Sequence, residues 1–200
     1  MTKYLDIFKK IGMVKEGHFE LTSGLHSGIY FEKFRLLEHP EITTLICKEI
    51  VKWCQELEDA QKDFSTVAGP TTGGIIIAYE LARQLGKRCI FAEKSEKGRE
   101  FKRGFEIKPG EQILVVDDIF TTGGSIRDTI SAVERKAGVV VGVGVIVDRS
   151  EGAIHELSLP VGIPFFSVYK SAVKNWKPSE CHLCKKSMEL TKPGGSKKSN

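Results

Sequence analysis

Hydrophobic residues along this chain follow two periodicities, one typical of buried strands and one typical of helices. Unbroken apolar, β-branched runs at residues 113–116 and 139–147 predict strands covered on both faces, as in a parallel sheet. Shorter apolar runs at residues 66–69, 88–92 and 163–168 predict three further strands. These strands form the expected core of the molecule.

Between the strands, apolar residues recur three or four positions apart, which predicts helices that pack one face against the sheet. Four segments have this spacing: residues 2–11, 40–57, 75–85 and 126–137. Pro40 suits a first helical turn, and Gly86 and Gly138 suit helix ends. Because strands and helices alternate, we expect an α/β fold with a mainly parallel central sheet and helices on both faces.

The region before the long helix has a different pattern. Phe19 and Leu21 alternate with polar residues, a Ser/Gly-rich segment follows, and an extended pattern resumes at Ile29 and ends with Tyr30 and Phe31. This pattern predicts a hairpin-like flap. On local evidence alone, its Ser/Gly segment is more typical of an ordinary turn than of a binding loop.

Composition narrows the class of protein. The 200 residues suit one domain, and the net charge of +4 is too small to indicate a nucleic-acid binder, although it is compatible with an anionic small molecule. No apolar run approaches the length of about 18 residues that spans a membrane, and the N-terminus lacks a signal-peptide core. Five cysteines, an odd number, do not suggest a secreted disulfide framework. We therefore expect a cytoplasmic protein that binds neither nucleic acid nor membrane.

Candidate chemistry is concentrated at residues 112–127. Asp117 and Asp118 follow the predicted strand, at the edge where open α/β sheets bind ligands, and the Thr/Gly/Ser stretch 121–125 then leads into a helix. Backbone N–H groups at a helix start can hold a phosphate. The carboxylates would repel a phosphate and instead suit sugar hydroxyls. An ordinary strand–turn–helix with an acidic loop is the alternative, but the combination favours a sugar-phosphate site.

Two other segments support an anionic ligand. Residues 71–74 form a second Thr/Gly loop between a strand and a helix, without the Gly-Lys-Ser/Thr of a Walker loop. Residues 93–104 carry five cations in polar, glycine-containing sequence, which predicts an exposed, mobile loop. Alone, such a run is more typical of a solvated hairpin tip. Because the chain also carries two predicted anion-binding loops, at 71–74 and 121–125, we interpret the run as functional.

The stretch 112–127 resembles the ribose-phosphate motif of the type I phosphoribosyltransferases. Leu21-Thr22-Ser23-Gly24 with Ser27, the pair Tyr30-Phe31, and Val147-Asp148-Arg149 extend the resemblance to the orotate phosphoribosyltransferase family, over residues 15–170. The resemblance implies the type I phosphoribosyltransferase fold with a small N-terminal hood or flap. It divides the chain into a helix and base-binding flap (1–35), a core (36–170) and a tail with a Cys-x-x-Cys motif (171–200).

That family implies an activity: Mg²⁺-dependent transfer of the 5-phosphoribosyl group from phosphoribosyl pyrophosphate to orotate, giving orotidine 5′-monophosphate and pyrophosphate in pyrimidine (UMP) biosynthesis. The Mg²⁺ would be held mainly by the substrate. The resemblance also implies a homodimer in which the basic loop 93–104 acts across the interface. A phosphoribosyltransferase for a purine or uracil is one alternative, against which Arg149 argues. A non-catalytic phosphoribosyl pyrophosphate-sensing regulator is another, for which we see no nucleic-acid-binding motif.

The resemblance assigns roles to individual residues. Catalytic roles fall on Lys94, Lys97, Arg99, Arg103, Asp117 and Asp118. The phosphoribosyl pyrophosphate site comprises Asp117, Asp118, Ile119, Phe120, Thr121, Thr122, Gly123, Gly124, Ser125, Thr71, Thr72, Gly73, Gly74 and Lys94. Orotate would contact Thr121, Arg149, Thr22, Tyr30 and Phe31. An arginine fork matches a carboxylate, although Arg149 by itself is also compatible with a surface arginine at a strand end.

The chain departs from the family pattern at three positions. Glu93 replaces the first arginine of the loop, Arg99 stands where histidine is expected, and Thr22 stands where many relatives carry lysine. Arg99 supplies charge but does not titrate near neutrality, so a histidine-like proton transfer is not expected from it. Arg103 could compensate.

The tail motif Cys181-His182-Leu183-Cys184 supplies two thiolates, half of a tetrahedral zinc site. His182 is too close to its neighbours to serve easily as a third ligand, and no second cysteine pair lies nearby. Two subunits could combine their pairs, or the thiols could be redox-active. A turn with free thiols is the simplest interpretation. Haem attachment is excluded because Lys185 follows the second cysteine.

Overall fold

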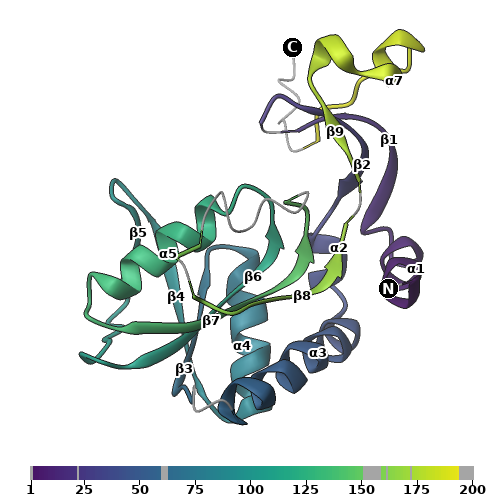
Figure 1. Ribbon diagram of the computed structural model, residues 1–200. Coiled ribbons are helices and arrows are strands. Elements are labelled where there is room, and N and C mark those ends of the chain that lie inside the picture. Colours follow the sequence, from purple (N-terminus) through teal and green to yellow (C-terminus); the bar gives the residue numbers. More distant parts are fainter. Residues whose placement is uncertain are drawn as a thin grey trace.

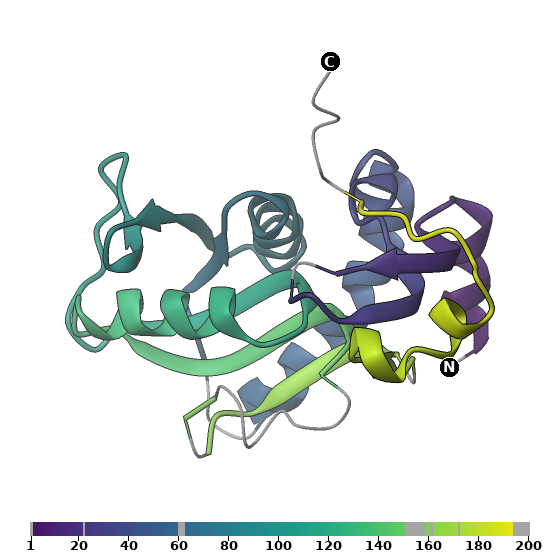
Figure 2. The same cartoon turned by 90° about the horizontal axis from the view of Figure 1, so that it is seen from above.

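The computed structural model describes residues 2–21, 23–59, 63–150, 159–160, 162–171 and 173–193. A six-stranded sheet forms the core, and a separate three-stranded sheet forms a hood beside it (Figures 1 and 2). No helix among the described residues is both long and apolar enough to cross a bilayer.

The central sheet is mainly parallel, as predicted. Its strand order is β5-β4-β3-β6-β7-β8, and only β4 and β5 pair antiparallel. The strands are β3 (Thr66–Pro70), β4 (Arg88–Ser95), β5 (Gly98–Phe101), β6 (Gln112–Phe120), β7 (Val139–Asp148) and β8 (Phe165–Lys170). From β3 the chain continues to β4 and β5 at one edge of the sheet, and from β6 it continues to β7 and β8 at the other edge. The adjacent carboxyl ends of β3 and β6 therefore form the switch point at which such sheets bind ligands.

Helices cover both faces of this sheet, also as predicted. On one face lie α3 (Pro40–Asp59) and α4 (Gly73–Leu85), and on the other lies α5 (Gly124–Glu134) (Figure 1). Alternation along β6 explains the two cores: Val116 packs in the cluster with α3 and α4, whereas Val115 packs in the cluster with α5.

The hood combines both ends of the chain. It contains α1 (Thr2–Lys10) and the antiparallel strands β1 (Val14–Glu20) and β2 (His26–Phe31), which confirm the predicted helix and hairpin. The short helix α2 (Phe34–Leu37) connects the hood to the core. From the tail, β9 (Asn175–Trp176) adds to β2, and the 3₁₀ turn η1 (Pro178–Glu180) and α7 (His182–Lys185) follow it. Segments more than 140 residues apart thus lie side by side (Figure 1).

Three local predictions need correction. The segment 93–104 is not an open loop, because β4 continues to Ser95 and pairs with β5, with Lys94 opposite Arg99. Strand β6 continues through the two aspartates to Phe120 rather than ending before them. Helix α5 ends at Glu134, and the chain reaches Gly138 through Ala137, whose φ is +59°. The prediction of disorder at residues 192–200 falls mostly outside the described residues; Lys192, which is described, pairs with Glu20 at 2.7 Å.

Candidate active site

Two buried carboxylates mark the centre of the site. Asp117 and Asp118, at the carboxyl end of β6, are 6% and 3% exposed. Asp117 Oδ1 accepts the backbone N–H of Asp118 at 2.8 Å, and Asp118 Oδ1 accepts that of Ile119 at 2.7 Å. Burial raises the pKa of Asp117 well above its ordinary value, and the neighbouring charge of Asp118 raises it further. The pair is therefore held in fixed positions, with its charge only partly compensated.

Lys33 supplies the nearest compensating charge, and the sequence reasoning missed it. Its Nζ lies 2.8 Å from Asp118 Oδ2. Lys33 follows the last residue of β2 by two positions, immediately before α2, so the hood reaches the acid pair through this side chain. Its position just after the Tyr30-Phe31 pair was the only sequence feature that could have drawn attention to it.

The predicted Thr/Gly loop 71–74 lies against the acid pair. A Cβ atom added to Gly73 would stand 1.6 Å from Asp118 Oδ2, and one added to Gly74 would stand 2.6 Å from Pro70 Cδ and 3.1 Å from Asp117 Oδ1. Only glycine permits this approach. Helix α4 begins at Gly73, so the backbone N–H groups of a helix start lie at the same place, with that of Ile75 donating to Thr72 O at 3.2 Å.

Arg99 joins this loop to the loop 121–125, which is the predicted sugar-phosphate loop. Together, the loops 71–74 and 121–125 are called the two anion loops. Its guanidinium donates to Thr71 Oγ1 at 3.1 Å and Thr71 O at 3.3 Å, to Ala92 O at 3.1 Å, and to Ser125 Oγ at 3.2 Å. Burial lowers the pKa of Arg99 below its ordinary value, although the charges of Asp117 and Asp128 oppose this effect. At 4% exposure, Arg99 is a fixed part of the site rather than a residue of a mobile loop.

The other three predicted loop cations are placed differently. Lys94 and Lys97 are exposed near the tip of the β4–β5 hairpin. Arg103 is exposed and forms two hydrogen bonds with the carboxylate of Glu93, at 2.9 and 3.1 Å. Among these four cations, Arg99 alone bonds to both anion loops.

The sugar-phosphate loop has the predicted arrangement, with one refinement. Thr121 and Thr122 are exposed, Gly123 has a φ of +72°, and α5 then begins at Gly124 with Ser125 in its first turn. Phe120 differs, because its side chain is buried against Phe165, with ring centroids 5.1 Å apart. It can offer only backbone groups to a ligand.

Arg149 and Phe31, two of the predicted base-binding residues, lie beside this loop. The backbone N–H of Arg149 donates to Phe120 O at 2.8 Å, and its guanidinium carbon lies over the Phe31 ring, 5.2 Å from the centroid. The Tyr30 ring lies 5.7 Å from that of Phe19.

Nearby charges also act on Tyr30. Burial and the charge of Glu32 raise the pKa of Tyr30, while the nearby cations Lys33 and Arg149 partly offset that rise. Tyr30 therefore shares its surroundings with both cations. Thr22 lies outside the described residues.

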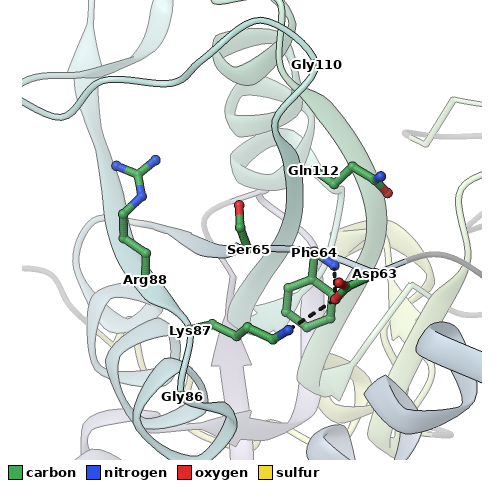
Figure 3. Close-up of a pocket in the computed structure, with 8 residues that line it drawn as sticks. All are labelled: Asp63, Phe64, Ser65, Gly86, Lys87, Arg88, Gly110 and Gln112. Carbon is green, nitrogen blue, oxygen red and sulfur yellow. Dashed lines mark hydrogen bonds and ion pairs between the residues drawn. The ribbon is translucent and has the colours of Figure 1, made fainter.

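A hollow lies at the opposite end of these strands, at the amino ends of β3, β4 and β6 (Figure 3). Two of its lining residues, Lys87 and Asp63, form an ion pair at 3.1 Å. Open parallel sheets bind ligands at the carboxyl ends of their strands, so the loops around Asp117 and Asp118 are the better candidate for a site.

Comparison with known proteins decides the family. Residues 35–178 match the phosphoribosyl transferase domain. Orotate phosphoribosyltransferase from Thermoanaerobacter sp. (strain X514) is 42% identical over 193 residues, covering 96% of each chain. The orotate phosphoribosyltransferase of Pelotomaculum thermopropionicum is 42% identical over 191 residues, which is 96% of this chain and 95% of that one. The chain belongs to the orotate phosphoribosyltransferase family.

Solved structures agree with this family assignment. The crystal structure of orotate phosphoribosyltransferase from Aeropyrum pernix superimposes with a TM-score of 0.70 at 30% identity, covering 82% of this chain and 92% of that chain. The type I phosphoribosyltransferase fold predicted from the motifs is thereby confirmed, and so is the assignment to the glycosyltransferase class of enzymes.

Proposed function

We propose that this protein transfers the 5-phosphoribosyl group from phosphoribosyl pyrophosphate to orotate in an Mg²⁺-dependent reaction. The products are orotidine 5′-monophosphate and pyrophosphate. The observation that carries the proposal is the junction of the two anion loops around Asp117 and Asp118, with Arg149 beside it.

Each part of phosphoribosyl pyrophosphate has a matching partner in this junction. Asp117 and Asp118 accept hydrogen bonds from the ribose hydroxyls. The loop 121–125 and the first turn of α5 hold the 5′-phosphate, and the loop 71–74 and the first turn of α4 hold the pyrophosphate. Ile119 and Phe120 contribute backbone groups. Arg99 keeps the two loops at a fixed separation, which suits a substrate that carries phosphates at both ends.

The residues present also fit Mg²⁺. This ion prefers oxygen ligands and commonly binds through one or two carboxylates together with substrate phosphates and water. Two buried carboxylates stand between two phosphate loops here. The ion would be held mainly by substrate oxygens, with Asp117 and Asp118 beside it, and when bound it would neutralise negative charge on the pyrophosphate leaving group.

Orotate is a flat ring that carries a carboxylate, and Arg149 offers a planar fork of donors that matches it. Phe31 lies under the Arg149 guanidinium and supports its orientation. Thr121, Tyr30 and Thr22 complete the proposed base site. A purine or uracil carries no carboxylate and has no use for this arginine, which is why orotate is the preferred base.

The reaction needs no protein nucleophile. As the anomeric bond breaks, positive charge develops on the ribose and negative charge on the pyrophosphate, and fixed groups of opposite charge stabilise both. Arg99 is already in place for this role. Lys94, Lys97 and Arg103 lie on or beside a hairpin that projects from the core (Figure 1), which suits action on the neighbouring subunit of a homodimer. Movement of the exposed hairpin tip, which carries Lys94 and Lys97, over the neighbouring site would also exclude water.

A panel of bases tests the proposal. Purified protein with phosphoribosyl pyrophosphate and Mg²⁺ should consume orotate, followed by its absorbance, and leave adenine, hypoxanthine and uracil unchanged. Omission of Mg²⁺ should abolish the reaction. Consumption of another base would keep the sugar-phosphate site and overturn the assignment of Arg149. Consumption of none would favour a regulator. As an enzyme of pyrimidine biosynthesis, the protein would act in the cytoplasm.

A further inference from the structure

Four side chains from opposite ends of the chain meet in the hood, away from the acid pair. They are His18 on β1, His26 on β2, Cys181 immediately before α7, and Cys184 within α7. One ligand atom from each lies within 4.8 Å of every other. His18, His26 and Cys181 are 2%, 5% and 1% exposed, and Cys184 closes the outer side.

The distances match a tetrahedral metal centre. For Zn–N bonds of about 2.0–2.1 Å and Zn–S bonds of about 2.3 Å, neighbouring ligand atoms of a tetrahedron lie about 3.3–3.8 Å apart. His18 Nε2 lies 3.0 Å from His26 Nδ1 and 3.4 Å from Cys181 Sγ. Cys184 Sγ lies 3.3 Å from His26 Nδ1 and 3.7 Å from His18 Nε2. A central ion therefore requires only small side-chain adjustments.

The surroundings of His18 orient it as a metal ligand. Its second ring nitrogen, Nδ1, lies 2.9 Å from the backbone carbonyl oxygen of Met188. A hydrogen bond from Nδ1–H to this oxygen leaves the lone pair of Nε2 directed at the two cysteines. Metal-binding histidines commonly have such a carbonyl partner. The arrangement thus includes an outer hydrogen bond as well as four ligands.

Contacts outside the cluster hold the tail in register with the hood. The backbone N–H of Thr191 donates to His18 O at 2.8 Å, and that of Glu20 donates to Thr191 O at 2.9 Å. Buried Leu183, between the two cysteines, packs over Gly28 of β2. The ring of His182 lies 4.4 Å from that of Trp176, and His182 is not one of the four clustered residues.

We propose that His18, His26, Cys181 and Cys184 bind one zinc ion. Two thiolates and two imidazoles form a closed Cys₂His₂ set, which is typical of structural zinc and leaves no open position for catalysis. Binding releases the two thiol protons, and the resulting centre of Zn²⁺ and two thiolates is electrically neutral. The ion fastens the C-terminal segment to the β1–β2 hairpin, which is only seven and six residues long in its two strands.

The site has a consequence for the base site, which rests on the function proposed above. His26 begins β2 and Phe31 ends it, so at about 3.3 Å per residue the metal and the Phe31–Arg149 contact lie about 16 Å apart along one strand. The ion is therefore a positioning element. Loss of zinc should raise KM for orotate more than KM for phosphoribosyl pyrophosphate.

Metal content of the full chain is the direct test. Protein purified from a zinc-containing medium without chelators should carry one zinc per chain by elemental analysis. Cys181→Ser combined with Cys184→Ser should lose it. Cys89→Ser is the matched control, since Cys89 lies on β4, outside the cluster, and its variant should keep one zinc.

A second measurement does not depend on the folding of a variant. Wild-type protein stripped of zinc and loaded with Co²⁺ should show the intense visible bands of a tetrahedral site and a thiolate-to-metal charge-transfer band.

The proposal is overturned if the wild type lacks bound zinc, if the double variant retains it, or if Cys181 and Cys184 are joined as a disulfide in freshly purified protein. Zinc content is measured separately from orotate turnover, so the two results can be judged one at a time. A zinc-bound but inactive protein would therefore overturn the proposed function alone, and an active protein without metal would overturn the zinc site alone.

Discussion

The ammonium group of Lys33 lies 2.8 Å from Oδ2 of Asp118, and this contact joins the hood to the catalytic edge of the sheet. Asp118 is buried, whereas the Lys33 side chain is 34% exposed. The acid pair thus depends on a cation delivered by a separate layer of the molecule.

Removal of that cation should destabilise the fold. Lys33→Ala leaves a buried carboxylate without its ion-pair partner, and we expect a loss of about 1–2 kcal/mol, less than for a fully buried pair because Lys33 is partly solvated. Urea unfolding at neutral pH measures this change. Lys52→Ala, which removes an exposed pair with Glu49, is the control and should cost less than about 0.5 kcal/mol. Equal effects of the two substitutions would contradict the assigned role of Lys33.

The close approach of the loop 71–74 to the acid pair gives a second prediction. Gly73→Ala places a methyl group where Asp118 Oδ2 now lies, so the loop or the aspartate must move, at a cost of about 1–3 kcal/mol in unfolding free energy. In the sugar-phosphate loop, a Cβ at Gly124 would meet only Thr122 Oγ1, at 3.9 Å. Gly124→Ala should therefore leave the unfolding free energy within about 0.5 kcal/mol of the wild type. If the order of the two effects is reversed, the packing described here is wrong.

The two arginines of the β4–β5 region should behave differently. Arg99→Ala removes hydrogen bonds to both anion loops from a buried position and should cost about 2–3 kcal/mol of stability. Arg103→Ala removes an exposed pair with Glu93 and should cost less than about 1 kcal/mol. Denaturation curves of both variants provide the comparison. A larger loss for Arg103→Ala would show that the hairpin is held differently.

Glu111 gives the fold a defined response to acid. Burial by itself would raise its pKa, but hydrogen bonds from Thr66, the Lys108 backbone and Arg88 lower the pKa of Glu111 to about 2, from 4.5. A carboxyl group with a lowered folded-state pKa adds stability above pH 4.5, and this contribution is lost as the pH falls toward 2.

The contribution of Glu111 should be about 1–2 kcal/mol, discounted because its Arg88 partner is 42% exposed. Glu111→Gln should remove it at pH 7 and leave little difference from the wild type at pH 2.5. Glu106→Gln, a change at an exposed position on the same connection, is the control. Urea midpoints at the two pH values measure the effect, and a Glu111→Gln deficit that persists unchanged at pH 2.5 would contradict it.

What the sequence predicted was encoded locally. The strand before Asp117, the glycine-containing loops at 71–74 and 121–125, and the hairpin ending in Phe31 each follow from residues adjacent in the chain. Because parallel strands end at one edge, the meeting of the two loops also followed from their order.

The sequence did not predict contacts between residues far apart in the chain, or a strand whose alternation of buried and exposed positions is hidden by a buried cation. His18 meets Cys181 across 163 residues, and no local spacing relates them. Lys33 reaches Asp118 in the same way. In β5, the buried positions are Arg99 and Phe101, so a cation occupies a place where the strand pattern calls for an apolar residue, and the hairpin resembled a charged loop.

The most direct test of the account is kcat/KM for orotate in wild type, Arg149→Ala and Arg83→Ala, with saturating phosphoribosyl pyrophosphate and Mg²⁺. Loss of a charge-assisted arginine fork should lower kcat/KM by about 100-fold, and Arg83, exposed on α4 and paired with Glu80, should be replaceable without effect. Both variants should remain folded, and Arg149→Ala should lose about 1 kcal/mol of stability through its contact with Phe31. Unchanged orotate turnover in folded Arg149→Ala would contradict the central claim that this arginine selects the base.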